Sequence, residues 1–147
     1  MTVNPKEIAD YLLCESRDRG EVLTHLKLQK LMYYAQAWSL APTGKPLFAE
    51  DFQAWVHGPV LPSQYARFRD NGWRPIDLDV VKPSLDAAVA KHLDEIVDVF
   101  GTETAVTLER MTHQEAPWLR AREGYAPHEK CIEVIEKDWM REYYSQL

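Results

Sequence analysis

A histidine and a glutamate in the C-terminal third of the chain are the residues best spaced for catalysis. One residue separates His113 from Glu115, and such a pair can act as base and acid or supply two metal ligands. A metal-assisted hydrolase using His113, Glu115 and also His57 is therefore one hypothesis. The alternative is a helix end, where the histidine caps carbonyl groups and the glutamate begins the next helix. The sequence has no His-x-x-x-His or Cys-x-x-Cys pair, which favours the structural interpretation.

The other reactive side chains carry no enzyme signature. His92 falls within an apolar stripe, as is typical of a structural histidine. Cys14 and Cys131 are far apart, lack the motifs around known thiol nucleophiles and indicate free thiols. There is no Gly-x-Ser-x-Gly elbow, phosphate loop or dinucleotide fingerprint. We therefore predict a protein that is not an enzyme, with no catalytic residue, metal ligand, cofactor or small-molecule substrate.

Two lysines on a strongly apolar segment raise the question of nucleic-acid binding. Lys27 and Lys30 lie about a helical turn apart. The formal net charge of −6 repels polyanions, however, and apolar residues flank both lysines. The alternative interpretation is a solvent-facing strip in which the lysine stems cover the core. No nucleic-acid partner is expected, and a basic protein would suit the total charge better.

Aromatic residues favour a protein partner instead. The chain contains 5 Trp, 7 Tyr and 4 Phe, and tyrosine and tryptophan are enriched where proteins bind each other. Most of these residues are expected in the core. Trp55, Tyr65 and Trp73 fall in loop-like surroundings, so we predict a partner-binding surface around them.

The elements that position these residues belong to one domain, which we expect to span residues 1–147. Apolar residues make up 46% of the chain and charged residues 27%, as in globular proteins. No stretch of 18 apolar residues predicts a membrane span, and the N-terminus lacks the pattern of a secretion signal. A cytoplasmic protein without membrane contact is expected.

The strongest element is a helix that begins after a Thr24 cap and stops at Pro42 and Gly44. It is apolar on two nearly opposite sides, so it is predicted to pack between other elements at the centre of the fold. One side carries Leu28, Leu31, Met32, Ala35 and Trp38, and the other carries Leu26, Tyr33, Ala37 and Leu40.

The remaining pattern predicts a mainly α fold, a single compact helical domain with this buried central helix and one small inserted β-hairpin. The predicted hairpin strands are residues 46–48 and 52–55, with Glu50 and Asp51 at the corner. A turn at 57–59, a short helix from Pro62 and a connecting arm over 73–83 follow. Further helices are predicted from an Asn4 cap to Gly20, from a Ser84 cap to Gly101, from Thr102 to about His113, from Pro117, and from about Ile132 to the end.

Three ordered blocks strongly resemble the Panacea domain, a family of SocA-like antitoxins and phage-associated GepA-like proteins. The first two are LTHLKLQKLMYYAQAW (23–38) and KPLFAEDFQAWVHGPVLPSQY (45–65). The third is LERMTHQEAPWLRAR (108–122), at Thr112, His113, Pro117 and Trp118. With the N-terminal helix, the resemblance covers nearly the whole chain.

The resemblance implies an antitoxin that neutralises a cognate toxin by direct protein–protein contact. It also implies that at least one branch of the family acts as an adaptor that delivers its toxin to an ATP-dependent cytoplasmic protease. Occlusion of the toxin and its delivery to a protease are therefore both open, as are the identity of the toxin and the face that binds it. A phage-derived protein that modulates another host process is a further alternative.

The matched residues are expected to have two kinds of role. Structural positions are Leu28, Leu31 and Trp38 in the core, Gly58 and Pro59 in a turn, and Thr112, His113, Pro117 and Trp118 in the third block. Lys27, Gln29, Lys30 and Tyr34 either anchor neighbouring chain or contact the partner, together with Trp55, Tyr65 and Trp73. A block shared by antitoxins that face different toxins favours the scaffold role.

Overall fold

The computed structural model, which describes residues 2–147, is mainly α-helical and contains one two-stranded antiparallel hairpin. This confirms the predicted fold class. The elements are α1 (Pro5–Asp18), α2 (His25–Thr43), β1 (Gln53–Trp55), β2 (Gly58–Val60), α3 (Pro62–Phe68), the 3-10 turn η1 (Arg69–Asn71), α4 (Ala87–Phe100), α5 (Ala105–His113), α6 (Ala116–Ala121) and α7 (Lys137–Tyr144). None of the helices in residues 2–147 is both long enough and apolar enough to cross a membrane.

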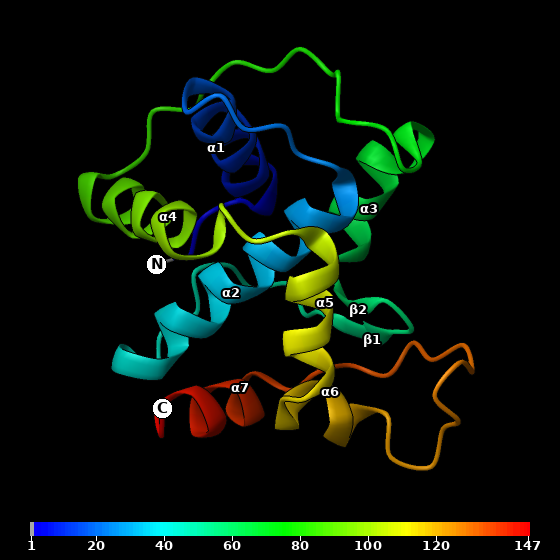
Figure 1. Cartoon of the computed structure of the whole chain (residues 1–147). Helices are drawn as coiled ribbons and strands as arrows, with labels where there is room; N and C mark the ends of the chain where they lie inside the picture. Colours follow the sequence, from blue (N-terminus) through cyan, green and yellow to red (C-terminus); the bar gives the residue numbers. More distant parts are fainter. Residues whose placement is uncertain (1) are drawn as a thin grey trace.

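Helix α2 passes through the middle of the molecule, as its two apolar sides predict (Figure 1). Helices α1, α3, α4, α5 and α7 and strand β2 all pack against it. Leu28 and Leu31 are fully buried, whereas Trp38 is half-buried and lies with its ring 5.7 Å from that of Tyr144. The Thr24 hydroxyl accepts a hydrogen bond from Lys27 N and so caps the helix. Central burial of α2 therefore positions the five helices and the strand that pack against it.

The hairpin lies later in the chain than predicted. Its strands are β1 and β2, joined by a two-residue turn at Val56 and His57, with Ala54 opposite Pro59. The prediction that residues 46–48 form a strand is wrong, and so is the prediction of a turn at Gly58 and Pro59. Gly58 has φ +114, a conformation that favours glycine, and it begins the second strand.

The Gln36 side chain explains why residues 46–48 need no strand partner. Its Oε1 accepts hydrogen bonds from the amides of Leu47 at 2.7 Å and Phe48 at 3.3 Å, and its Nε2 donates to Phe48 O at 2.8 Å. One buried amide therefore satisfies the backbone groups that a neighbouring strand would otherwise bind. This arrangement leaves Leu47 and Phe48 in the core without regular secondary structure.

Three later helices begin after their predicted starts. Helix α4 is capped by Asp86 instead of Ser84, because the Asp86 side chain accepts a hydrogen bond from Ala88 N. Helix α5 is capped by Thr104 instead of Thr102, because the Thr104 side chain accepts a hydrogen bond from Thr107 N. Helix α7 begins at Lys137, five residues after the predicted Ile132. The cause is a contact with the hairpin: Ala54 N donates to Glu133 O at 2.9 Å, and Ile135 N donates to Phe52 O at 2.9 Å. Residues 133–135 thus lie along β1 as an extended segment.

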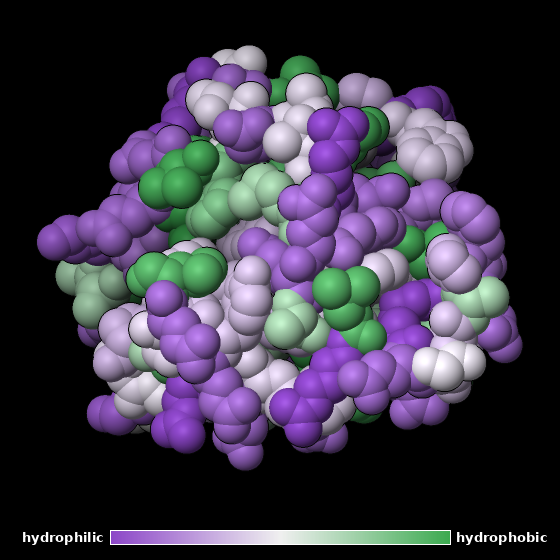
Figure 2. All heavy atoms as spheres, turned by 60° about the horizontal axis from the view of Figure 1, so that its bottom comes forward, coloured by the Kyte–Doolittle hydropathy of each residue, from purple (hydrophilic) through white to green (hydrophobic). Residues whose placement is uncertain are grey.

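The predicted connecting arm crosses α1 between α3 and α4 (Figure 1). Arg17 donates to Ile76 O at 2.9 Å, and Lys82 binds Glu15 at 2.7 Å, so both ends of the arm are attached to α1. The opposite end of the molecule, which carries α6 and α7, presents mostly hydrophilic residues with separate hydrophobic patches (Figure 2).

Candidate groove and buried polar cluster

Four segments that are distant in the sequence enclose a groove of about 380 Å³. They are the first two residues of α2, the hairpin turn with Val60, the α3–η1 region as far as Trp73, and the loop at residues 128–132. The predicted binding residues Trp55, Tyr65 and Trp73 all line this groove. The structure therefore brings these three aromatic residues together, although their role in binding stays a prediction.

The aromatic rings form the inner surface of the groove. The Tyr65 ring lies between those of Trp55 and His25, each with its centroid 4.8 Å from that of Tyr65. Trp55 Nε1 donates to Gln53 Oε1 at 2.8 Å, which fixes the indole. Trp73 stands at the edge with 76% of its surface exposed, and its ring centroid is 6.3 Å from that of His57. This surface is concave, apolar and only partly covered by the chain itself.

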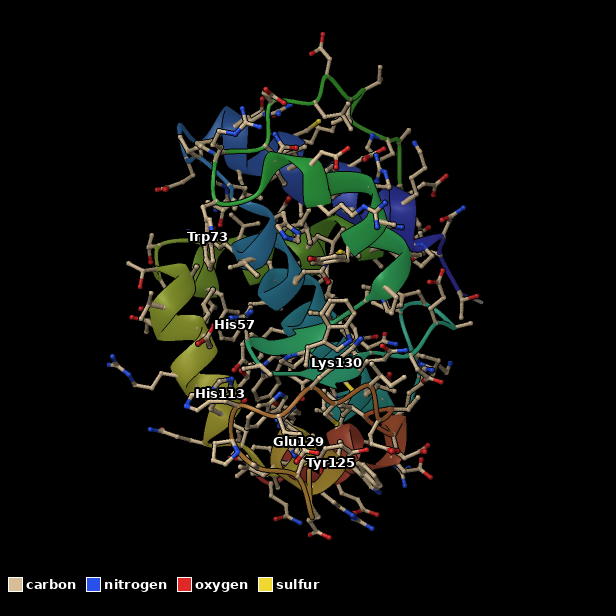
Figure 3. All side chains as sticks on the ribbon, turned by 90° about the vertical axis from the view of Figure 1, so that its right-hand side faces the viewer. His57, Trp73, His113, Tyr125, Glu129 and Lys130 are labelled. Atoms are coloured by element: carbon tan, nitrogen blue, oxygen red, sulfur yellow. The ribbon has the colours of Figure 1, made fainter. Side chains whose placement is uncertain are left out.

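The groove also contains residues that sequence reasoning did not select. Figure 3 looks onto this face, where Trp73 and His57 lie near each other and Lys130 lies across from them. Arg69, Lys130 and Ile132 complete the rim, and Ile132 is 59% exposed. Gly124 and Pro127 were the available signals, because both residues favour a loop rather than a helix over this segment.

Four other predicted binding residues lie inside the fold. Lys27 Nζ donates to Gly101 O at 2.5 Å, Gln29 Oε1 accepts from Leu61 N at 2.8 Å, and Tyr34 OH donates to Glu115 Oε1 at 2.8 Å. Lys30 is fully buried. The interpretation of Lys27 and Lys30 as a solvent-facing strip is therefore wrong. These contacts favour the anchoring role over partner contact.

Lys30 is the centre of a buried polar cluster with Thr112 and Gly58. Within residues 2–147, no hydrogen-bond acceptor is in reach of Lys30 Nζ. Burial lowers the pKa of the Lys30 ammonium to about 8, while the carboxylate of Glu109 opposes this shift. A Cβ added to Gly58 would lie 3.1 Å from Lys30 Cε and 3.2 Å from Thr112 Oγ1. Gly58 thus leaves the space that the lysine side chain occupies.

The third sequence block attaches α5 and α6 to the hairpin. His113 stacks on Trp118 with ring centroids 4.0 Å apart, and Trp118 Nε1 donates to Trp55 O at 2.9 Å. Arg122 donates to Ala54 O at 2.9 Å and to Glu129 O at 2.6 Å. Pro117 and Thr112 are buried. These contacts explain how the block supports the groove without lining it.

His113 and Glu115, the pair considered for hydrolysis, have different partners. Glu115 Oε1 accepts hydrogen bonds from Tyr34 at 2.8 Å and Tyr144 at 2.6 Å. Burial raises the pKa of the Glu115 carboxyl and lowers the pKa of the His113 ring, so both groups favour their neutral forms. His57 contacts neither His113 nor Glu115, because its Nδ1 lies 3.3 Å from Glu109 Oε1. The chain in residues 2–147 does not assemble three His, Cys, Asp or Glu side chains around one point.

Fold and site together define a helical protein with an open aromatic groove and a buried polar cluster around Lys30 next to the hairpin. The chain belongs to the SocA-like antitoxin family with a Panacea domain, because the model of that family matches residues 28–119, more than half of the chain. The chain is also similar to the curated protein "Antitoxin SocA" of Caulobacter vibrioides (strain NA1000 / CB15N). The two are 29% identical over 130 residues, covering 80% of this chain and 69% of that protein. No solved structure matches the chain.

Proposed function

We propose that this antitoxin neutralises its cognate toxin by direct binding, and that the groove around Trp55, Tyr65 and Trp73 is the contact surface. The observation that carries the proposal is the exposure of Trp73 and Ile132 at the rim of an apolar groove. Large apolar side chains gain free energy when a partner covers them, and tryptophan is among the residues most often dominant in protein interfaces. Family membership supports a toxin as that partner.

Co-expression with the neighbouring open reading frame tests the function. The neighbour alone is expected to arrest growth, co-expression is expected to restore it, and the two proteins are expected to copurify. A neighbour that is harmless alone and forms no complex would contradict the proposal.

Trp73→Ala tests the groove as the contact surface. Removal of this exposed indole is expected to weaken the complex by about 2 kcal/mol, roughly thirtyfold in Kd, with little change in stability. Trp55→Ala is expected to weaken binding more than it alters helix content. Leu119→Ala is the matched control, since Leu119 is an exposed apolar residue of α6 outside the groove. Calorimetry measures all three, and equal Kd values for Trp73→Ala and the unmodified protein would contradict the assignment.

The antitoxin can neutralise its toxin by occluding it or by delivering it to an ATP-dependent protease. The two mechanisms predict different toxin levels when the two proteins are co-expressed. We propose occlusion, because the groove lies on the surface and offers a contact that blocks the bound region of the toxin. A constant toxin level during rescue is the expected result. A toxin level that falls with co-expression, and recovers in a strain lacking the protease, would favour the adaptor role instead.

A further inference from the structure

The charges that line the groove are opposite in sign to the charge of the whole chain. The protein has 23 acidic and 17 basic side chains, yet no aspartate or glutamate is among the lining residues. Arg69 and Lys130 carry permanent positive charges at the rim, and His25, His57 and His128 also line the groove. The residues that line the groove therefore carry a positive formal charge on an acidic protein.

Three carboxylates near the groove each have a partner, and the partner of Glu109 is the groove residue His57. Glu109 lies 3.3 Å from His57 Nδ1, Glu129 accepts a hydrogen bond from Ala126 N at 2.9 Å, and Glu133 accepts one from the Tyr125 hydroxyl at 3.0 Å. Figure 3 shows Glu129 and Tyr125 on the side of Lys130 that faces away from Trp73. Among the hydrogen bonds and ion pairs of residues 2–147, none uses the charged end of Arg69 or Lys130. Both cations are free to meet a partner.

The volume and the lining of the groove suit a partner that offers both a large apolar side chain and a carboxylate. A volume of about 380 Å³ lies at the lower end of the range of roughly 300–1,000 Å³ for ligand pockets, so it accepts a few side chains and not a folded domain. The Tyr65, Trp55 and Trp73 rings suit a large apolar side chain. The cationic rim suits a carboxylate placed next to that side chain.

We propose that the groove binds an acidic segment of the toxin, in which a large apolar side chain lies next to one or more carboxylates. This inference rests on the proposed function and specifies its ligand. A nucleic acid fits less well, because two permanent cations neutralise few phosphates and the field of a chain with net charge −6 opposes a polyanion.

Synthetic peptides test this chemistry without requiring the toxin. The probe is a short fluorescein-labelled peptide in which glutamate alternates with tryptophan and leucine, measured by fluorescence anisotropy against the full chain. Two further peptides carry glutamine or lysine in place of every glutamate. The glutamate peptide is expected to bind most tightly and to weaken as salt increases, since rim charges are screened. Equal binding of the glutamate and glutamine peptides, tighter binding of the lysine peptide, or no binding at all would overturn the proposal.

Charge reversal locates the interaction. The double variant Arg69→Glu with Lys130→Glu is expected to weaken glutamate-peptide binding about tenfold. The matched control is Lys91→Glu with Arg110→Glu, which makes the same charge change at exposed positions outside the groove. All four positions are exposed, so folding is expected to persist, and circular dichroism checks this. Equal weakening by both double variants would show a general charge effect and contradict a groove site.

The same variants separate this inference from the proposed function. A toxin complex that is unaffected by the groove double variant, together with no preference for the glutamate peptide, overturns the acidic-segment proposal and leaves the antitoxin function intact. Groove-dependent peptide binding without any toxin complex supports the ligand chemistry and contradicts the function. A single-stranded oligonucleotide that binds more tightly than the glutamate peptide would replace the proposal with nucleic-acid binding.

Discussion

The side chain of Lys30 lies in the interior next to Gly58 and Thr112, and these three residues limit the space available to one another. Gly58 has no side chain, and this leaves room for the lysine stem. Thr112 donates its hydroxyl to Glu109 O at 2.8 Å, and its Oγ1 would lie 3.2 Å from a Cβ added at position 58. An ionised lysine without an acceptor is costly to bury, so this cluster reduces stability at the position where α2, β2 and α5 meet.

Lys30→Met is expected to stabilise the protein near neutral pH. The pKa of Lys30 is lowered from 10.5 to about 8, so between these values the unfolded chain binds more protons than the folded one and stability rises with pH. Below about pH 8 the folded protein bears the full penalty, of about 3 kcal/mol, which methionine removes. Urea unfolding at about pH 7 and about pH 9.5 checks this. If the free energy of unfolding rose equally from about pH 7 to about pH 9.5 in the unmodified protein and in Lys30→Met, the prediction would be contradicted.

Gly58→Ala is expected to destabilise the fold by about 1–3 kcal/mol, because it combines a disfavoured φ with contacts to Lys30 and Thr112. Gly20→Ala is the matched control: Gly20 has φ +79 but no atom within 4 Å of an added Cβ. The difference between the two urea midpoints isolates the crowding. Equal losses of stability would show that conformation alone requires glycine at position 58.

At the scale of the elements, residues 112–122 hold the hairpin and the loop at 126–133 in place. Trp118 binds Trp55 O, and Arg122 binds carbonyl oxygens of both the hairpin and the loop. Trp55 and Lys130 therefore occupy fixed positions although both come from short or irregular segments. The walls of the groove depend on these contacts, since the loop has no regular structure of its own.

Arg122→Lys is expected to loosen the loop and to cost about 1–3 kcal/mol. A lysine has one ammonium group and cannot reach Ala54 O and Glu129 O with the two arms of a planar guanidinium. Faster amide hydrogen exchange over residues 126–133, with unchanged exchange in α2, is the expected signature. Arg110→Lys, at an exposed position of α5, serves as control. Exchange that stays slow in the loop would show that other contacts fix it.

The start and the burial of helix α2 could be predicted, because two apolar stripes and a Thr24 cap are local signals, but the helix continues through Pro42 to Thr43 instead of stopping at the proline. The hairpin could be predicted to exist but not to begin at Gln53. Its position depends on Gln36, which binds residues 47–48, and on residues 133–135, which pair with β1. No local pattern encodes such contacts. For the same reason Trp55, Tyr65 and Trp73 could be selected for the groove, whereas Lys130 and Ile132 arrive there from the far end of the chain.

For the molecule as a whole, total charge and local charge lead to opposite expectations. A net charge of −6 favours a basic partner at long range, while the groove lining favours an acidic segment at contact. Salt is therefore expected to weaken the final contact of a groove-bound acidic peptide, even though the whole chain repels it. Charge summed over a sequence does not identify the sign of a binding surface.

The chain is expected to unfold in a single transition, as the predicted single domain spanning 1–147 requires. Helix α2 packs against α1, α3, α4, α5, α7 and β2, so its loss removes the support of all of them. Tryptophan fluorescence and far-ultraviolet circular dichroism in urea are expected to give the same midpoint. Two separated midpoints would contradict a single cooperative unit.

The extended segment at residues 133–135 also determines when the groove can exist during synthesis. The groove wall at 130–132 reaches its position because the next residues lie along β1, and β1 is made some eighty residues earlier in the chain. A nascent polypeptide therefore presents an incomplete groove until this segment has emerged from the ribosome. On the proposed function, binding through the groove therefore follows the synthesis of residues 133–135 and not that of the hairpin alone.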